Sequence, residues 1–203
     1  MNKDKELRFW HKLSIGLVIL ILAGGYFFKD YYKRSRVIKF MTEYLPYEAA
    51  VEEYDSAEYF DLDWQKTLAI TIIESDCKQG AISYRYIYTK KGRYKKILAE
   101  GYKQIAPVTQ PVAWKGLRKI KDMKGIGRFD PEFQMWGGNF LFRDILDNLA
   151  LGINEKELYI NALLIYNMGF TSFNTSGVRY RNYKYVQKWS RHYTAIKYAW
   201  KEF

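Results

Sequence analysis

The sequence is poor in the residues that build disulfides and metal sites. Its 203 residues include one cysteine, Cys77, and two histidines, His11 and His192. A single cysteine excludes an intramolecular disulfide, and it leaves the redox compartment open. The histidines lie near opposite ends of the chain, so we expect no metal site, and we expect no cofactor.

Aromatic and basic residues are abundant instead. Aromatic residues make up 18% of the chain, with 19 Tyr and 6 Trp, and the formal net charge is +11. Tyr and Trp offer an apolar face with a polar group, which suits both sugar recognition and ordinary core packing. The charge favours an anionic partner, such as a nucleic acid, a membrane surface or an acidic wall polymer. No nucleic-acid-binding motif is present, so we expect no nucleic acid partner.

The N-terminal part of the chain has the pattern of a membrane anchor. Leu13–Phe28 carries no charge, and Trp10 and Tyr31–Tyr32 flank it as interfacial anchors. We therefore expect a short basic tail over 1–12 and a transmembrane signal anchor over 13–32. A cleaved signal peptide is the alternative, because small residues at 23–25 resemble a cleavage site. Basic residues lie on both sides, so charge does not decide the orientation.

The charge changes sign after the anchor. Residues 40–64 hold eight carboxylates and no Lys or Arg, whereas Lys78–Lys124 is strongly basic. We expect a linker and acidic helix over 33–58 that packs on a single domain over 59–203. A solvated acidic face is the alternative for 40–64, and a solvated surface is the alternative for most lysines of the basic stretch.

The hydrophobic spacing predicts a mainly α fold. A small β-hairpin is expected around Ser83–Tyr94, with Lys91-Gly92 as its turn. Five stretches have helical spacing: Trp64–Asp76, Pro111–Met123, Asp130–Leu149, Glu155–Asn167 and Tyr183–Trp200.

Glu74 is the candidate catalytic residue. The predicted helix begins after Asp63, which can cap it, and an apolar face runs along the helix as far as Glu74. A carboxyl beside apolar walls resists ionisation, so its pKa rises and it can donate a proton near neutral pH. On these residues alone, a solvent-facing carboxylate at a helix end remains the alternative.

Segments further along the chain resemble, in order, the lytic transglycosylase domain of the soluble type, which is related to goose-type lysozyme. Ile72-Ile73-Glu74-Ser75 is similar to the family's catalytic helix, which ends in Glu-Ser. Gly101–Thr109 is similar to its Gly-Leu-Met-Gln-Ile element, and Asp130–Leu141 is similar to its Asp-Pro element. Ala162–Gly169 is similar to its Ala-Leu-Ala-Ala-Tyr-Asn-Ala-Gly element, and Tyr185–Lys188 to its Tyr-Val-x-Lys element. The resemblance covers Phe60 to Trp189 and implies a lysozyme-like helical domain.

The chain departs from the family pattern close to Glu74. Lys103 stands where the family usually has Met, and a cation near Glu74 would lower the pKa of its carboxyl. The connection over residues 77–100 is also longer than is usual. Both departures bear on substrate detail and activity.

The resemblance implies a specific reaction and a set of site residues. A lytic transglycosylase is a carbon–oxygen lyase that cleaves the β-1,4 bond between N-acetylmuramic acid and N-acetylglucosamine and leaves a 1,6-anhydro end. Glu74 would be the single general acid and base, and Asp76, two residues on, would point away from it. The implied substrate-binding residues are Ser75, Ser83, Gln104, Tyr166, Asn167 and Tyr185. Tyr166 would orient Glu74.

The expected partners are peptidoglycan glycan strands and, through Leu13–Phe28, the membrane. The expected location is the cytoplasmic membrane, with a single pass and the catalytic domain outside the cytoplasm. Two alternatives remain. One is a catalytically degenerate scaffold that binds the wall within a secretion or division machine, and the other is a hydrolytic lysozyme that uses water.

Overall fold

The structure is a computed structural model that describes residues 3–89, 92–149, 154–169, 173–174 and 180–203. The chain separates into two units, Met1–Lys39 and Phe40–Phe203. The first unit consists of most of one long helix, and the second contains the remaining helices and a two-stranded sheet. The mainly α fold with a small hairpin is therefore confirmed.

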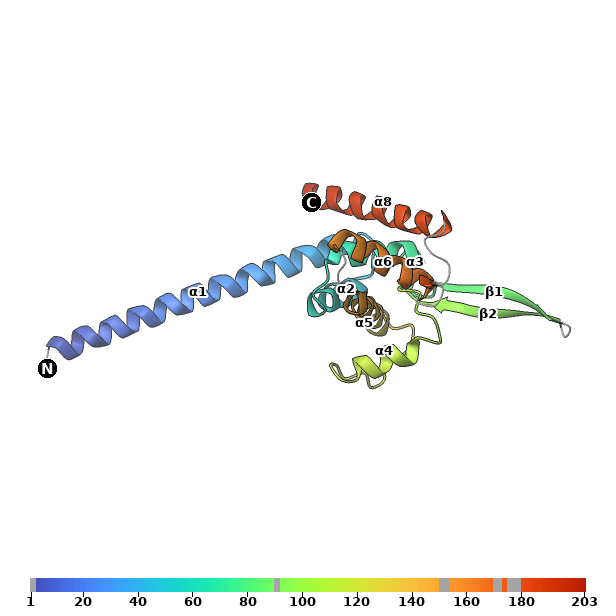
Figure 1. Cartoon of the computed structure of the whole chain (residues 1–203). Helices are drawn as coiled ribbons and strands as arrows, with labels where there is room; N and C mark the ends of the chain where they lie inside the picture. The colour runs from blue at the N-terminus through green and yellow to red at the C-terminus, as the bar shows by residue number, and fades with distance from the viewer. Residues whose placement is uncertain (1–2, 90–91, 150–153, 170–172, 175–179) are drawn as a thin grey trace. The chain divides into compact units, whose positions relative to one another are not determined.

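Helix α1 (Lys3–Met41, Figure 1) contains the apolar segment. From Ser14 it is long and apolar enough to cross a membrane. Within the described part of the chain it alone meets this test. The helix continues past residue 32 because residues 33–41 contain neither Gly nor Pro, the residues that most disfavour a helix.

The second unit consists of helices that pack in pairs beside one hairpin. The helices and strands have these bounds: α2 Tyr47–Tyr59, α3 Trp64–Ser75, β1 Ile82–Thr89, β2 Gly92–Glu100, α4 Gln110–Leu117, α5 Pro131–Leu149, α6 Glu155–Met168 and α8 Tyr180–Glu202. Helix α2 packs on α5, α3 on α8, α4 on α5, and α5 on α6.

A local sequence signal places the start of α3, whereas the helix ends at Ser75, one residue before the predicted end. The carboxylate of Asp63 accepts a hydrogen bond from the backbone N–H of Gln65 at 2.9 Å, as the predicted cap requires. At the other end, Asp76 has a left-handed backbone with φ 54°, and its N–H bonds to the carbonyl of Ile72. The helix therefore stops one residue after Glu74.

Helix α4 is shorter than its sequence predicts. The expected end at Met123 is wrong, because α4 ends at Leu117 and a tighter turn follows, in which the N–H of Lys119 bonds to the carbonyl of Gly116 at 3.1 Å. Leu117 and Met123 are both buried in one cluster with Phe133. Packing of both apolar side chains thus overrides continued helical winding.

The hairpin is longer than predicted and extends away from the helices (Figure 1). Its antiparallel register runs from Ile82 opposite Glu100 to Thr89 opposite Gly92, with an irregularity between Ser83 and Tyr84. The predicted turn at 91–92 lies partly outside the described residues. Glu100 also forms a bridge with Ile105, which joins the base of the hairpin to the loop after it.

The acidic segment does not form a fully solvated face. Glu53, on α2, is completely buried, and its neighbour Glu52 accepts a hydrogen bond from the indole N–H of Trp136 at 2.7 Å. Helix α2 therefore packs against α5 and α3 with part of its surface.

Candidate active site

A cavity of about 450 Å³ lies where α3, the start of β1 and the loop after β2 meet. Its lining residues come from four segments: Ile72–Asp76, Ala81–Ser83, Gln104 and Lys188. Glu74, Ser75, Ser83 and Gln104 were all predicted from the sequence, and the fold brings them together around this cavity. Lys188 was not predicted.

Buried side chains fix Glu74 at the cavity. Leu68, Ala69 and Ile70 anchor α3 in the core, whereas Ile72 and Ile73 are partly buried and line the cavity beside the carboxyl. Helix α8 is held against α3 by Trp189, whose indole N–H donates to the carbonyl of Lys66 at 3.2 Å.

Tyr185 lies one helical turn before Trp189 and reaches Glu74 directly. Its hydroxyl donates a short hydrogen bond to Oε1 of Glu74. Burial raises the pKa of Tyr185 well above its usual value, so the hydroxyl stays a donor. The sequence placed Tyr185 in the site, and the structure shows that it is a hydrogen-bond partner of the candidate acid.

The Glu74 carboxyl titrates near neutral pH. Burial raises the pKa of Glu74 from 4.5 to about 7, and this effect exceeds three opposing ones. The Tyr185 hydrogen bond and the positive charges of Lys103 and Lys188 each lower the pKa, because each favours the carboxylate. The carboxyl is partly exposed on its cavity side and otherwise surrounded by protein. Near pH 7 it can therefore both donate and accept a proton.

A second carboxylate near Glu74 is in a different environment. Asp76 also lines the cavity, but its side chain is 80% exposed and forms an ion pair with Lys78 at 3.1 Å. It lies beyond the end of α3 rather than against the apolar wall. Among the described residues, no group of three His, Cys, Asp or Glu side chains is arranged to hold a metal ion.

Gln104 is held in a fixed orientation. Its backbone is left-handed, with φ 49°, and its side-chain amide nitrogen donates to the carbonyls of Ala81 and Gly101 at 3.0 and 2.9 Å. Both amide N–H groups are thereby used, so the side-chain oxygen is the group that remains to accept a hydrogen bond from a ligand. Ser83 is exposed at the cavity, and Ser75 is buried with its hydroxyl bonded to the carbonyl of Thr71 at 3.1 Å.

Tyr166 and Asn167 are not among the residues that line the cavity. The Tyr166 hydroxyl donates to the backbone carbonyl of Lys103 at 3.0 Å, and Asn167 is exposed near the end of α6. The resemblance implies that Tyr166 orients Glu74, whereas the side chain that hydrogen-bonds to Glu74 in the structure is Tyr185.

Lys103 is buried beside the site and is paired. Its ammonium lies 2.8 Å from Oε1 of Glu53 and 3.0 Å from the carbonyl oxygen of Thr67. The expected effect on Glu74 has the right sign, but burial outweighs it, and the pKa of Glu74 is raised overall.

The sequence contains a signal for the position of Lys188 but none for the burial of Glu53. Lys188 could have been found, since it follows Tyr185 by three residues and so shares its helix face. Glu53 gave no such signal, because its acidic surroundings are typical of a solvated surface.

A protein-family scan finds no model that matches the chain. The chain is 28% identical over 171 residues to the membrane-bound lytic murein transglycosylase F of Shewanella frigidimarina (strain NCIMB 400). It is similar to a lytic murein transglycosylase. The similarity covers 82% of this chain but 30% of the relative, so the chain spans about a third of that protein's length.

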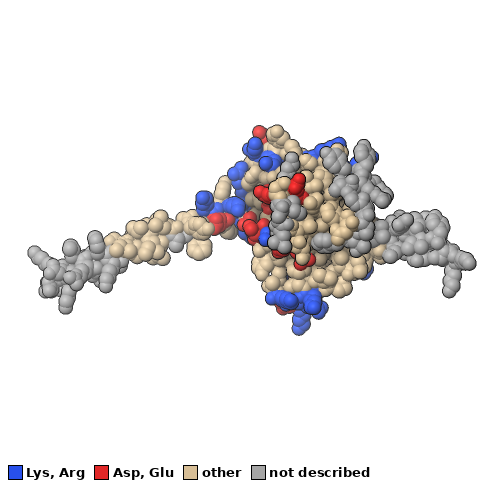
Figure 2. Space-filling view, in the orientation of Figure 1, with Lys and Arg blue, Asp and Glu red and all other residues tan. Residues whose placement is uncertain are grey.

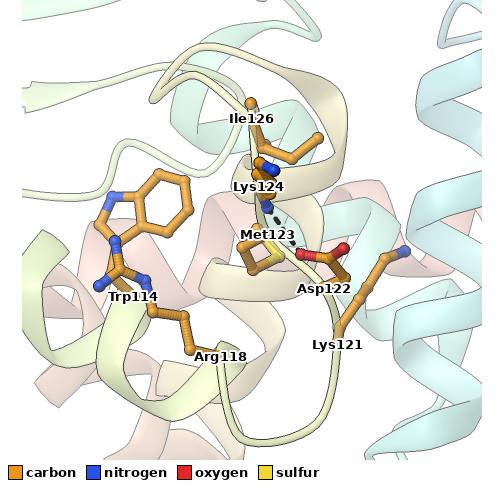
Figure 3. A pocket seen from close by; sticks show the side chains of 8 residues that line it. Trp114, Arg118, Lys121, Asp122, Met123, Lys124 and Ile126 are labelled. Carbon is orange, nitrogen blue, oxygen red and sulfur yellow. Dashed lines mark hydrogen bonds between the residues drawn. The ribbon is translucent and has the colours of Figure 1, made fainter.

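A second cavity, of about 560 Å³, lies beside α4 and shares no lining residue with the first (Figure 3). Trp114, Met123 and Ile126 provide its apolar lining. Lys121 is engaged by Glu52 and Glu132, at 3.2 and 2.8 Å.

The same region carries several exposed cations. Figure 2 shows Lys and Arg side chains gathered at the edge of the molecule where α4 lies in Figure 1. We call four exposed cations here the α4 basic surface: Lys115, Arg118, Lys119 and Lys124.

Proposed function

We propose that this chain is a peptidoglycan lytic transglycosylase with Glu74 as its single general acid and base. The observation that carries the proposal is the Glu74 carboxyl, with a pKa of about 7, at a cavity beside apolar side chains. The similarity to a murein transglycosylase over most of the chain supports the same reaction class.

One group with this pKa can serve both proton transfers. Protonated Glu74 gives its proton to the glycosidic oxygen, and the bond from that oxygen to C1 of N-acetylmuramic acid breaks. The C6 hydroxyl of the same sugar then forms a bond to C1, and its proton passes to the Glu74 carboxylate. The product is a 1,6-anhydro sugar, Glu74 is protonated again, and no water is consumed. Because the nucleophile belongs to the substrate, the second step is intramolecular, which is a large entropic advantage.

The neighbours of Glu74 support this cycle. The Tyr185 hydroxyl and the charges of Lys103 and Lys188 favour the carboxylate that forms when the proton leaves. Burial favours the acid that starts the cycle. The balance of these effects keeps both forms accessible near neutral pH.

The remaining predicted residues have supporting roles in this proposal. The Gln104 side-chain oxygen and the Ser83 hydroxyl are positioned to bind polar groups of the sugar. Tyr166 holds the Lys103 carbonyl and thereby the loop that presents Gln104. Asn167 follows Tyr166 at the end of α6 and has no direct role in the reaction as we propose it.

We also propose that α1 anchors the enzyme in the cytoplasmic membrane through Leu13–Phe28, with the catalytic unit outside the cytoplasm. The length and apolar character of α1 support the anchor, and the relative is described as membrane-bound. Peptidoglycan lies outside the cytoplasmic membrane, so this orientation is the one that brings the site to its substrate.

Digestion of purified peptidoglycan by the full-length chain in detergent tests the proposal. The matched control is Glu74→Gln, which keeps the side-chain shape and an acceptor for Tyr185 but cannot donate a proton. We expect 1,6-anhydro muropeptides from the wild-type protein and none from the variant. Products heavier by one water would instead assign a lysozyme reaction. If the folded wild-type protein gives no products but still sediments with peptidoglycan, the protein is a scaffold that binds the wall without cleaving it.

A further inference from the structure

Lys103 is an unusual residue for the interior of a protein. Its side chain is 1% exposed, and that of its partner Glu53 is completely buried. The ammonium is bonded to the Glu53 carboxylate on α2 and to the backbone carbonyl of Thr67 on α3. Thr67 lies two turns before Glu74 on the same helix. Lys103 therefore connects α2 to the helix that carries the candidate acid.

The backbone of Lys103 makes two more tertiary contacts. Its N–H donates to the side-chain oxygen of Gln134 on α5 at 3.3 Å, and its carbonyl accepts the hydroxyl of Tyr166 on α6 at 3.0 Å. The next residue is Gln104, which lines the cavity. One buried residue thus links four helices to the loop that presents Gln104.

The surrounding sequence leaves room for this side chain. A Cβ added at Gly138 on α5 would lie 2.4 Å from Cγ of Lys103, so a larger residue there would collide with the lysine stem. Glycine is therefore required where α5 passes the Lys103 side chain.

Stability alone does not explain a buried ion pair. Replacing such a pair with apolar groups is often neutral or stabilising, because two charges must leave water. The pair is also incompletely bonded, since Oε2 of Glu53 is buried and has no hydrogen-bond partner among the described residues. We therefore attribute this buried pair, which contacts the helix that carries Glu74, to a role at the candidate active site rather than to the stability of the core.

We propose that Lys103, with its charge balanced by Glu53, is the positioning residue of this site, and that it fixes α3 and the Gln104 loop while its cation acts on Glu74. This proposal deepens the proposed function, and the part of it that concerns catalysis rests on that function.

Other groups lie near Glu74 as well. Tyr185 and Lys188 on α8 and Tyr166 on α6 interact with it, and Asp76, after the end of α3, lines the same cavity. Of the two described cations that lower the pKa of Glu74, Lys103 has the larger effect, and it is buried whereas Lys188 is exposed. Loss of the Lys103 charge therefore raises the pKa of Glu74.

Titration of the Glu74 carboxyl by NMR tests the proposal without any need for catalysis. The full-length chain, labelled with carbon-13 at the Glu carboxyls, is titrated in detergent micelles, and Glu74→Gln identifies the signal. The test variant is Glu53→Gln with Lys103→Met, which removes both charges together and so leaves no buried charge without its partner. We expect it to fold and the Glu74 midpoint to move to higher pH. In the digestion assay, we expect the pH dependence of cleavage to move the same way.

The matched control is Glu52→Gln with Lys121→Met. This second pair also joins α2 to a lysine after β2, at 3.2 Å, but Lys121 is not among the groups that act on Glu74. We expect the control to leave the Glu74 midpoint at its wild-type value.

The proposal would be overturned by a folded Glu53→Gln/Lys103→Met variant whose Glu74 titrates as in the wild type, which would make the pair purely structural. If that variant does not fold, Glu53→Gln alone carries the test, because the unpaired buried ammonium then loses its proton and the Glu74 midpoint must again rise. Unfolding of both variants would also overturn it, because the pair would then serve only to stabilise the fold.

A wild-type chain that cleaves no peptidoglycan would contradict the proposed function, and the titration would still decide the role of Lys103.

Discussion

Replacing Glu74 with Gln should stabilise the folded protein at neutral and alkaline pH, and much less in acid. Burial raises the pKa of this carboxyl in the folded chain from 4.5 to about 7. Between these values the folded state binds more protons than the unfolded state, so the free energy of unfolding falls as the pH rises. A Gln side chain cannot ionise and is not subject to this loss.

The size of the effect follows from the two pKa values. Each pH unit between them is worth about 1.4 kcal/mol, so the difference of about 2.5 units gives an upper limit of about 3.5 kcal/mol. The carboxyl is partly exposed at the cavity, and solvent screening reduces this figure to about 2 kcal/mol. The advantage of the variant should therefore be nearly constant below pH 4.5, grow from pH 4.5 to 7, and stay constant above that range.

Denaturant unfolding of the full-length chain at pH 4 and pH 8 measures this difference. The control is Asp76→Asn, which neutralises the exposed neighbouring carboxylate and suits the same left-handed backbone. We expect the advantage of Glu74→Gln over the wild type to increase between the two pH values, and that of the control to stay nearly level. An equal advantage of Glu74→Gln at both pH values would refute the burial argument.

Two further predictions follow from the site and from the α4 surface. Tyr185→Phe removes a hydrogen bond to a charged group, worth about 1.5–3 kcal/mol, so peptidoglycan cleavage should slow roughly 10- to 100-fold. An unchanged rate across pH would show that the bond has no part in the reaction. Arg118→Gln with Lys124→Gln should weaken sedimentation with peptidoglycan several-fold in low salt, because wall peptides carry carboxylates. The control removes two exposed charges from α8, Lys197 and Lys201, and equal losses from both pairs would point to net charge alone.

The sequence predicts best what depends on neighbouring residues. Asp63 caps α3 as its side chain and position suggest, and Glu74 ends an apolar helix face that does reach the core. The hairpin also forms where its residues indicate. These features rest on hydrogen bonds and side-chain spacing within one or two turns or strands.

Contacts between distant segments are what the sequence does not predict. Glu53 and Lys103 are 50 residues apart, and neither has a local pattern that indicates burial. The early end of α4 has the same origin, because Leu117 and Met123 both pack in one cluster rather than continue a helix. The hydrogen bond from Tyr185 to Glu74 spans 111 residues and depends on how α8 packs against α3. Each requires the tertiary fold.

The origin of the oxygen at the new sugar ends tests the central claim most directly. Full-length wild-type protein digests peptidoglycan in heavy-oxygen water, and the products are weighed by mass spectrometry beside those of Glu74→Gln. A reaction in which Glu74 passes a proton to the leaving oxygen and the C6 hydroxyl closes the ring predicts anhydro ends without heavy oxygen, from the wild type alone. Heavy oxygen in every new end, or equal products from the variant, would contradict it.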